Sequence, residues 1–173
     1  MNRTVTTKRS IGIFLTAVSL CAVSAIDAQS PPDLSGTWVF APDKSQGTPT
    51  VPRIFNTRGA PAGSNELQIT QTPTNVTVKI GGVELVYRTD GTEGNISADG
   101  RAGFPIGKAA WEGGRLVAVL TQEVFSVAKS DYVKVPIRET YSLADGVLTL
   151  ERNRTHVDGK TDTQKLVYAK SSS

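Results

Sequence analysis

The stretch NVTVKIGGVELVYR, residues 75–88, decides the fold. Apolar side chains alternate with polar ones on both sides of Gly81-Gly82, and this period of two is typical of strands with one buried face. Two glycines between such strands form a two-residue hairpin loop, and the loop sets the register. Val76 then lies opposite Tyr87 on the apolar face. The sequence therefore predicts an antiparallel hairpin whose apolar face turns towards a core.

Two further turns give the same result. Gly113-Gly114 places Trp111 on the apolar face of a hairpin, and Asp145-Gly146 does so for Tyr141. Because sequential hairpins favour an up-and-down meander and closure removes its exposed edges, we predict an all-β fold. The predicted architecture is an antiparallel up-and-down β-barrel of eight or nine strands, with a β-sandwich as the alternative. The candidate strands are 34–40, 66–71, 75–80, 83–89, 107–112, 115–127, 132–143, 147–155 and 163–169.

Residues 1–28 have the pattern of a secretory signal peptide. A basic start is followed by an apolar centre at 11–23 and by small residues at 24–28. We therefore expect residues 29–173 to form one exported domain that is secreted or periplasmic. The apolar centre is shorter than the roughly 20 residues that a membrane-spanning helix needs, so no stable transmembrane anchor is expected. A lipoprotein is not expected either, because the large Leu20 precedes Cys21.

Composition excludes several kinds of site. Cys21 is the one cysteine and leaves with the signal peptide, so the domain has no thiol for a disulfide, a nucleophile or zinc. His156 is the one histidine, and we expect neither a metal site nor a cofactor. The net charge of +3 belongs mostly to residues 1–28, so the domain is near neutral and no nucleic-acid partner is expected.

Glu139 breaks the apolar face of its strand. The alternation of residues 133–143 points this carboxylate inward, and the register of Asp145-Gly146 places Arg152 opposite it. The sequence thus predicts a cross-strand ion pair inside the barrel. Three interpretations stay open: a structural pair, a polar anchor for the head group of a ligand, and a catalytic carboxylate.

Two long segments interrupt the strands. Residues 41–64 are rich in Pro, Gly, Ser and Thr, and residues 89–106 are rich in Gly and Asp. They are either solvated surface loops or a lid over an open barrel end, and a protein partner that binds through them is an alternative role.

Gly36-Thr37-Trp38 on the first strand resembles the Gly-x-Trp of lipocalins, in which the Trp closes the barrel floor. Ser130-Asp131-Tyr132 resembles the Thr-Asp-Tyr turn of the same family, with Ser in place of Thr. Arg152 or Arg154 then matches the lipocalin arginine that packs over the Trp. The order of the motifs is similar to that in small exported bacterial lipocalin-like proteins of unknown function. One departure is that no helix precedes the last strand.

The resemblance implies a non-catalytic barrel that binds a small apolar or amphipathic molecule. We expect its ligand-binding residues to be Tyr87, Trp111, Glu139, Tyr141 and Arg152, and its floor to be formed by Trp38 and Arg154. No catalytic residue is assigned. The alternatives are a filled barrel that acts as an envelope interaction or inhibitor module, and an isomerase or hydratase that works inside a cavity.

Overall fold

A computed structural model of the chain describes residues 30–47, 65–98, 100 and 103–172. The predicted signal peptide and most of the segment 41–64 lie outside these residues, so both remain predictions.

The described chain is built from ten strands and one short 3-10 helix, η1 (Pro42–Lys44). The strands form one antiparallel sheet in the order β4-β3-β2-β1-β10-β9-β8-β7-β6-β5. Their bounds are β1 (Gly36–Phe40), β2 (Glu66–Gln71), β3 (Asn75–Ile80), β4 (Val83–Arg88), β5 (Gly94–Asn95), β6 (Ile106–Glu112), β7 (Arg115–Ser126), β8 (Asp131–Ala144), β9 (Val147–Thr155) and β10 (Thr161–Lys170).

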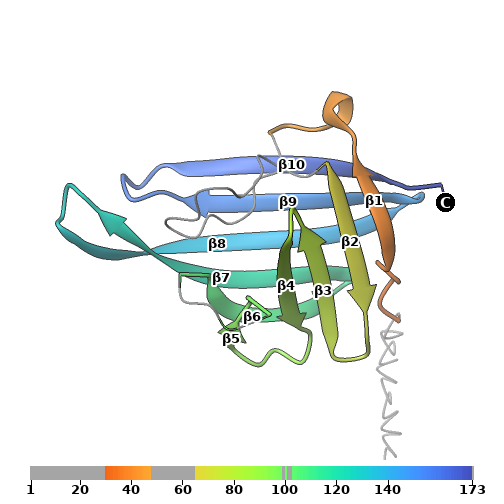
Figure 1. Cartoon of the computed structure of the whole chain (residues 1–173), viewed down its shortest axis with the longest axis horizontal. Helices are drawn as coiled ribbons and strands as arrows, with labels where there is room; N and C mark the ends of the chain where they lie inside the picture. Colours follow the sequence, from red (N-terminus) through yellow and green to blue (C-terminus); the bar gives the residue numbers. More distant parts are fainter. Residues whose placement is uncertain (1–29, 48–64, 99, 101–102, 173) are drawn as a thin grey trace, which may run out of the picture.

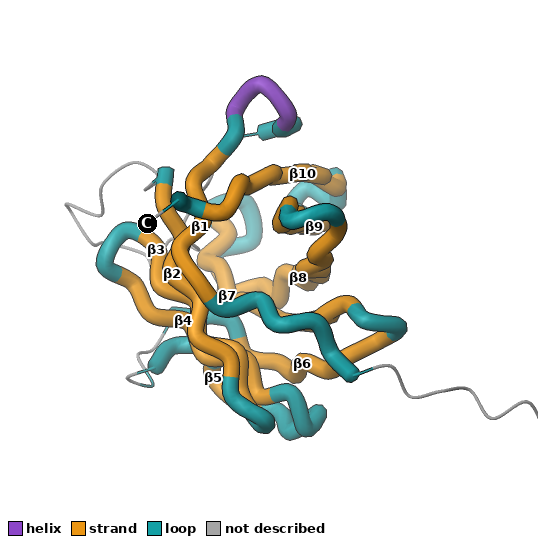
Figure 2. The backbone as a smooth tube through the Cα atoms, turned by 90° about the vertical axis from the view of Figure 1, so that its right-hand side faces the viewer, coloured by secondary structure: helices purple, strands orange, loops and turns teal. Residues whose placement is uncertain are grey.

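This topology confirms the predicted up-and-down barrel rather than the sandwich. Neighbours in the sheet are consecutive in the chain, except that β1 pairs with β10. The strands follow one another around a ring in the view of Figure 2. The ring nearly closes between β4 and the segment that follows it, where the amide of Val86 donates to the carbonyl of Ile96 at 2.7 Å.

The predicted hairpin registers are also confirmed. Val76 pairs with Tyr87 across β3 and β4, and Tyr141 pairs with Leu150 across β8 and β9. β5 was not predicted, because Gly94 and Asn95 carry no apolar alternation and pair with β6 by their backbone alone.

The hairpins extend further at one end of the barrel than at the other. The hairpins β7–β8 and β9–β10 extend well beyond the other strands at the left of Figure 1, whereas the C-terminus lies at the right, near β1.

The buried core includes Trp38, Tyr87, Tyr141 and Tyr168, each at most 1% exposed. Within the described ranges, no helix is long and apolar enough to cross a membrane.

Candidate functional site

The predicted ion pair lies at the centre of a buried polar cluster. Arg152 Nε donates to Glu139 Oε1 at 2.6 Å across β8 and β9. The hydroxyl of Tyr87 donates to Glu139 Oε2 at 2.7 Å and lies 3.3 Å from the hydroxyl of Tyr141. In the sheet, five strands lie between β4 and β8, namely β3, β2, β1, β10 and β9, so the bond from Tyr87 to Glu139 crosses the barrel interior. Four of the five predicted ligand-binding residues therefore meet in one network.

Burial and charge act together in this cluster. Burial, and then the negative charge of Glu139, raise the pKa of Tyr87 and Tyr141 well above the ordinary tyrosine range. Burial acts to lower the pKa of the Arg152 guanidinium, but the negative charge of the neighbouring Glu139, together with the two tyrosines, acts in the opposite direction. The pKa of Arg152 is therefore raised. The tyrosines thus stay protonated as hydrogen-bond donors, and Arg152 stays positively charged.

Small side chains lie beside Glu139 on its other flank. The register places Ala118 opposite Glu139, and Ala109 opposite Ala118. Both alanines are buried. Their small volume leaves room for the ring of Tyr87 to reach Glu139 from the opposite wall.

Three buried polar atoms near this pair have no hydrogen-bond partner among the residues that the structure describes. They are the hydroxyl of Tyr168, Oε1 of Gln164 and Nε of Arg154. Gln164 lies opposite Arg152 on the β9–β10 ladder. Burial raises the pKa of Tyr168 to about 12, with opposing effects from the charges of Arg152 and Glu139, which places its ring close to the pair. A buried polar atom without a partner is rare in native proteins and requires an explanation.

Tyr168 and Gln164 were not among the predicted site residues. The turn at Asp158-Gly159 left the register of the last strand ambiguous in the sequence. The observed pairing of Gln164 with Arg152 removes that ambiguity, because Gln164 and Tyr168 are an even number of residues apart and so share the inward face.

The structure places Trp38 and Arg154 far from each other. Trp38 is buried and its indole Nε1 donates to the carbonyl of Leu34 at 2.9 Å. The ammonium of Lys170 lies 5.6 Å from the centre of the Trp38 ring. Arg154 pairs with Asp162 near the opposite end of β10, and its Nη2 donates to Oε1 of Gln122 at 3.3 Å. Lys170 therefore occupies the position over the Trp38 ring that the resemblance implied for an arginine.

Trp111 lies at the margin of the cluster. It is half-buried against the core, and the register aligns it through Leu116 with Tyr141 in one row across β6, β7 and β8. Trp111 thus lines the same inner wall as the cluster, one row from Glu139.

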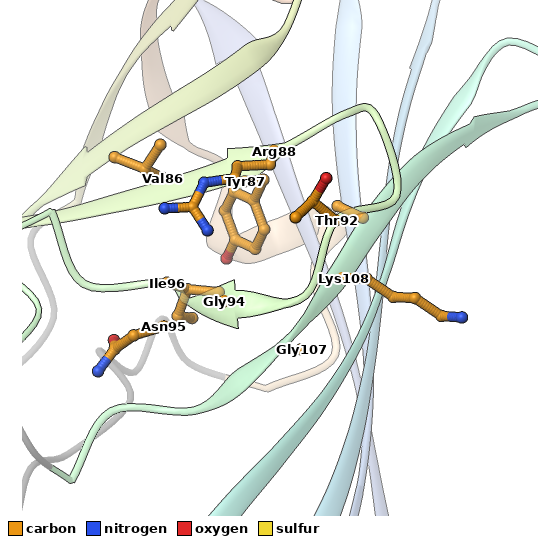
Figure 3. Close-up of a pocket in the computed structure, with 10 residues that line it drawn as sticks. Val86, Tyr87, Arg88, Thr92, Gly94, Asn95, Ile96, Gly107 and Lys108 are labelled. Carbon is orange, nitrogen blue, oxygen red and sulfur yellow. The ribbon is translucent and has the colours of Figure 1, made fainter.

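Described residues line at least two cavities. The first, shown in Figure 3, lies between β4, β5 and β6 and has a volume of about 10 Å³, which is room for roughly one water molecule. The second is a groove of about 930 Å³ on the outer face of the barrel, over β6, β7 and β8. Within the described residues, no group of three His, Cys, Asp or Glu side chains is placed to hold a metal ion.

Comparisons with known proteins find likeness among solved structures. No protein-family description matches the chain, and no curated protein sequence matches it. Among solved structures, the REP1-NXSQ fatty acid transporter is similar, with 13% sequence identity and a TM-score of 0.47. The similarity covers 81% of this chain and 97% of that one.

Proposed function

We propose that the protein is an exported, non-catalytic barrel that binds a small amphipathic molecule, whose polar head group contacts the β9–β10 wall. The observation that carries this proposal is the set of three buried polar atoms around Arg152 that find no partner within the described ranges. Leaving such an atom unpaired costs about 1–3 kcal/mol, and a ligand that supplies the missing hydrogen bonds recovers part of that cost.

The charge of the site suggests the chemistry of the head group. Glu139 and Arg152 neutralise each other, but within the described residues no carboxylate lies within ion-pair distance of Arg154. Burial, and then the positive charge of Arg152, lower the pKa of Arg154, whereas the negative charge of Asp162 acts in the opposite direction. The wall therefore presents the guanidinium of Arg154 and the donor hydroxyl of Tyr168, and these hydrogen-bond donors favour a head group with acceptor oxygens.

Burial also indicates a direction of entry. Tyr87, Glu139 and Tyr141 are each 1% exposed, whereas Gln164 and Arg154 are only half-buried. Exposure thus increases towards the end where the long hairpins extend (Figure 1). We place the ligand's route at that end.

Glu139 is a poor candidate for a catalytic base. Each of its carboxylate oxygens already accepts a short hydrogen bond, one from Arg152 and one from Tyr87. A general base must lie within hydrogen-bond reach of the proton that it removes, and the two donors already occupy one lone pair on each oxygen. The cluster therefore supports binding better than catalysis.

Displacement of a hydrophobic fluorescent dye tests this function. We expect dodecanoate to displace the dye better than dodecanol, which has the same alkyl chain without the charge. Tyr168→Phe should weaken dodecanoate binding by roughly threefold to tenfold, the value of one lost hydrogen bond. Thr70→Val is the matched control, because it also removes one hydroxyl and Thr70 is exposed on the outer side of β2. Folded protein that binds neither compound would contradict the proposal.

Export is tested separately. The chain, expressed with its own N-terminus in a bacterial host, should be recovered from the periplasm or medium with a new N-terminus near residues 25–28. Recovery of the uncut chain from the cytoplasm alone would argue against export but would leave the binding proposal standing.

A further inference from the structure

Exposed apolar side chains gather on one outer face of the barrel. Within the described residues, six large hydrophobic side chains are exposed, and Val39 on β1 is the one that lies elsewhere. The other five belong to β6, the β7–β8 hairpin and its tip: Ile106, Val119, Phe125, Val127 and Tyr132. Single exposed apolar residues are ordinary, but a contiguous group marks an interaction surface.

The strand registers bring four of these side chains together. Val119 lies opposite Lys108, and Ile106 lies opposite Thr121. The rings of Phe125 and Tyr132 meet edge to face, with their centres 5.4 Å apart. All four side chains line the groove of about 930 Å³, which is large enough to receive several side chains of a partner.

The charges around the groove are balanced. Lys108 and Lys134 contribute two positive charges, and Glu93 and Glu123 contribute two negative ones. A surface with no net charge does not attract a nucleic acid or an anionic membrane. It is complementary to itself, because a two-fold axis can bring each carboxylate near a lysine of an identical surface.

The shape of the same region supplies a projection that fits the groove. The β7–β8 hairpin projects beyond the barrel in Figure 1, and Val127 near its tip is 84% exposed. A projecting apolar side chain and an apolar groove thus lie on the same element, the geometry that a reciprocal contact between two copies requires.

We propose that two copies of this chain form a two-fold dimer through the outer faces of β6, β7 and β8, each copy placing its β7–β8 tip in the groove of the other. This face is separate from the inward cluster, so the proposal does not depend on ligand binding.

Sedimentation velocity over a range of concentrations tests the dimer. We expect a discrete dimer for the natural chain. Val119→Glu should raise the dissociation constant of this dimer at least tenfold. Val39→Glu is the matched control and should leave the dimer intact, because Val39 is equally exposed but lies on β1. A natural chain that is monomeric at every concentration would overturn the proposal, and so would open-ended polymers or a Val39→Glu variant that dissociates equally.

Exchange of charges gives a second test that does not depend on an apolar position. Glu123 and Lys134 lie opposite each other in the monomer and both line the groove. Glu123→Lys alone and Lys134→Glu alone should each weaken the dimer, because like charges then meet across the two-fold axis. Mixing the two variants should restore pairing as a heterodimer, since only the contact between chains is repaired. Failure of the mixture to pair would contradict the two-fold arrangement.

Other occupants of the groove are distinguished by the same proteins. If the natural chain is monomeric and binds neutral phospholipid vesicles or a hydrophobic dye through this face, Val119→Glu will abolish that binding and no dimer will be seen. That result would replace the dimer with a lipid or small-molecule site.

Discussion

Glu139 is held by two donors that come from different walls of the barrel. Replacing Glu139 with Gln removes the charge that compensates Arg152, and an uncompensated buried charge is costly. We expect Glu139→Gln to lower the free energy of unfolding by about 3 kcal/mol in urea denaturation. Glu151→Gln, on the exposed face of the same β9 strand that carries Arg152, should change it by less than about 0.5 kcal/mol. Equal effects of the two variants would argue against the pair as a structural element.

The hydroxyl of Tyr168 has the opposite effect on stability. It is buried, and none of the described residues bonds to it, so its removal should not weaken the empty protein. We expect Tyr168→Phe to raise the free energy of unfolding by about 1 kcal/mol, because the cost of an unsatisfied buried group disappears. Thermal unfolding without ligand measures this, with Thr70→Val on the outer side of β2 as the neutral control. A destabilised Tyr168→Phe variant would show that the hydroxyl has a structural role.

The sequence was sufficient to predict one part of the site. Alternation along β8 and the turn at Asp145-Gly146 fix Glu139 opposite Arg152, because both signals are local. The bond from Tyr87 could not be predicted, since it depends on how far apart two non-adjacent walls lie after closure. The unpartnered state of Tyr168 also depends on the whole interior, which no local pattern describes.

At the scale of the strand, Gly107 allows β6 to approach β7 closely. A Cβ at this position would collide with the carbonyl oxygen of Val119 and the Cα of Leu120, and backbone atoms cannot move aside cheaply. We expect Gly107→Ala to lower the free energy of unfolding by at least about 2 kcal/mol. Gly94→Ala on β5 is the control, because its Cβ would meet only the flexible end of the Arg88 side chain. Denaturant unfolding of both variants should separate them, and equal losses would contradict this account of β6.

The strands show where sequence patterns are reliable. Hairpins with short glycine turns were predicted with their registers, because turn and alternation constrain the same few residues. β5 was missed because it forms only where β6 offers its backbone edge. The outer groove was also missed, since Phe125 and Tyr132 lie on the polar side of the alternation and their meeting depends on the register of two long strands.

At the scale of the whole molecule, three of the four tyrosines are buried inside the barrel. Their burial makes the barrel lose stability at alkaline pH. In the folded protein the pKa of Tyr168 is raised to about 12 by burial, and the pKa values of Tyr87 and Tyr141 are raised further. In the unfolded chain tyrosine ionises near pH ~10. Above that pH the unfolded chain releases protons that the folded barrel retains. The contribution of the buried tyrosines to stability is therefore fully present below about pH 10 and falls as the pH rises towards 12.

We expect each buried tyrosine to remove about 1.4 kcal/mol of stability per pH unit in this window, or about 4 kcal/mol per unit for the three together. Urea unfolding at a series of pH values measures the slope. Lysines titrate in the same range, so the informative quantity is the difference between the natural chain and Tyr168→Phe, whose slope between about pH 10 and 12 should be shallower by about 1.4 kcal/mol per unit. Thr70→Val, on the exposed outer side of β2, should keep the natural slope, because it removes no ionisable group. If Tyr168→Phe kept the natural slope as well, Tyr168 would have to ionise without unfolding, and its hydroxyl would not be enclosed in the way that the proposed head-group site requires.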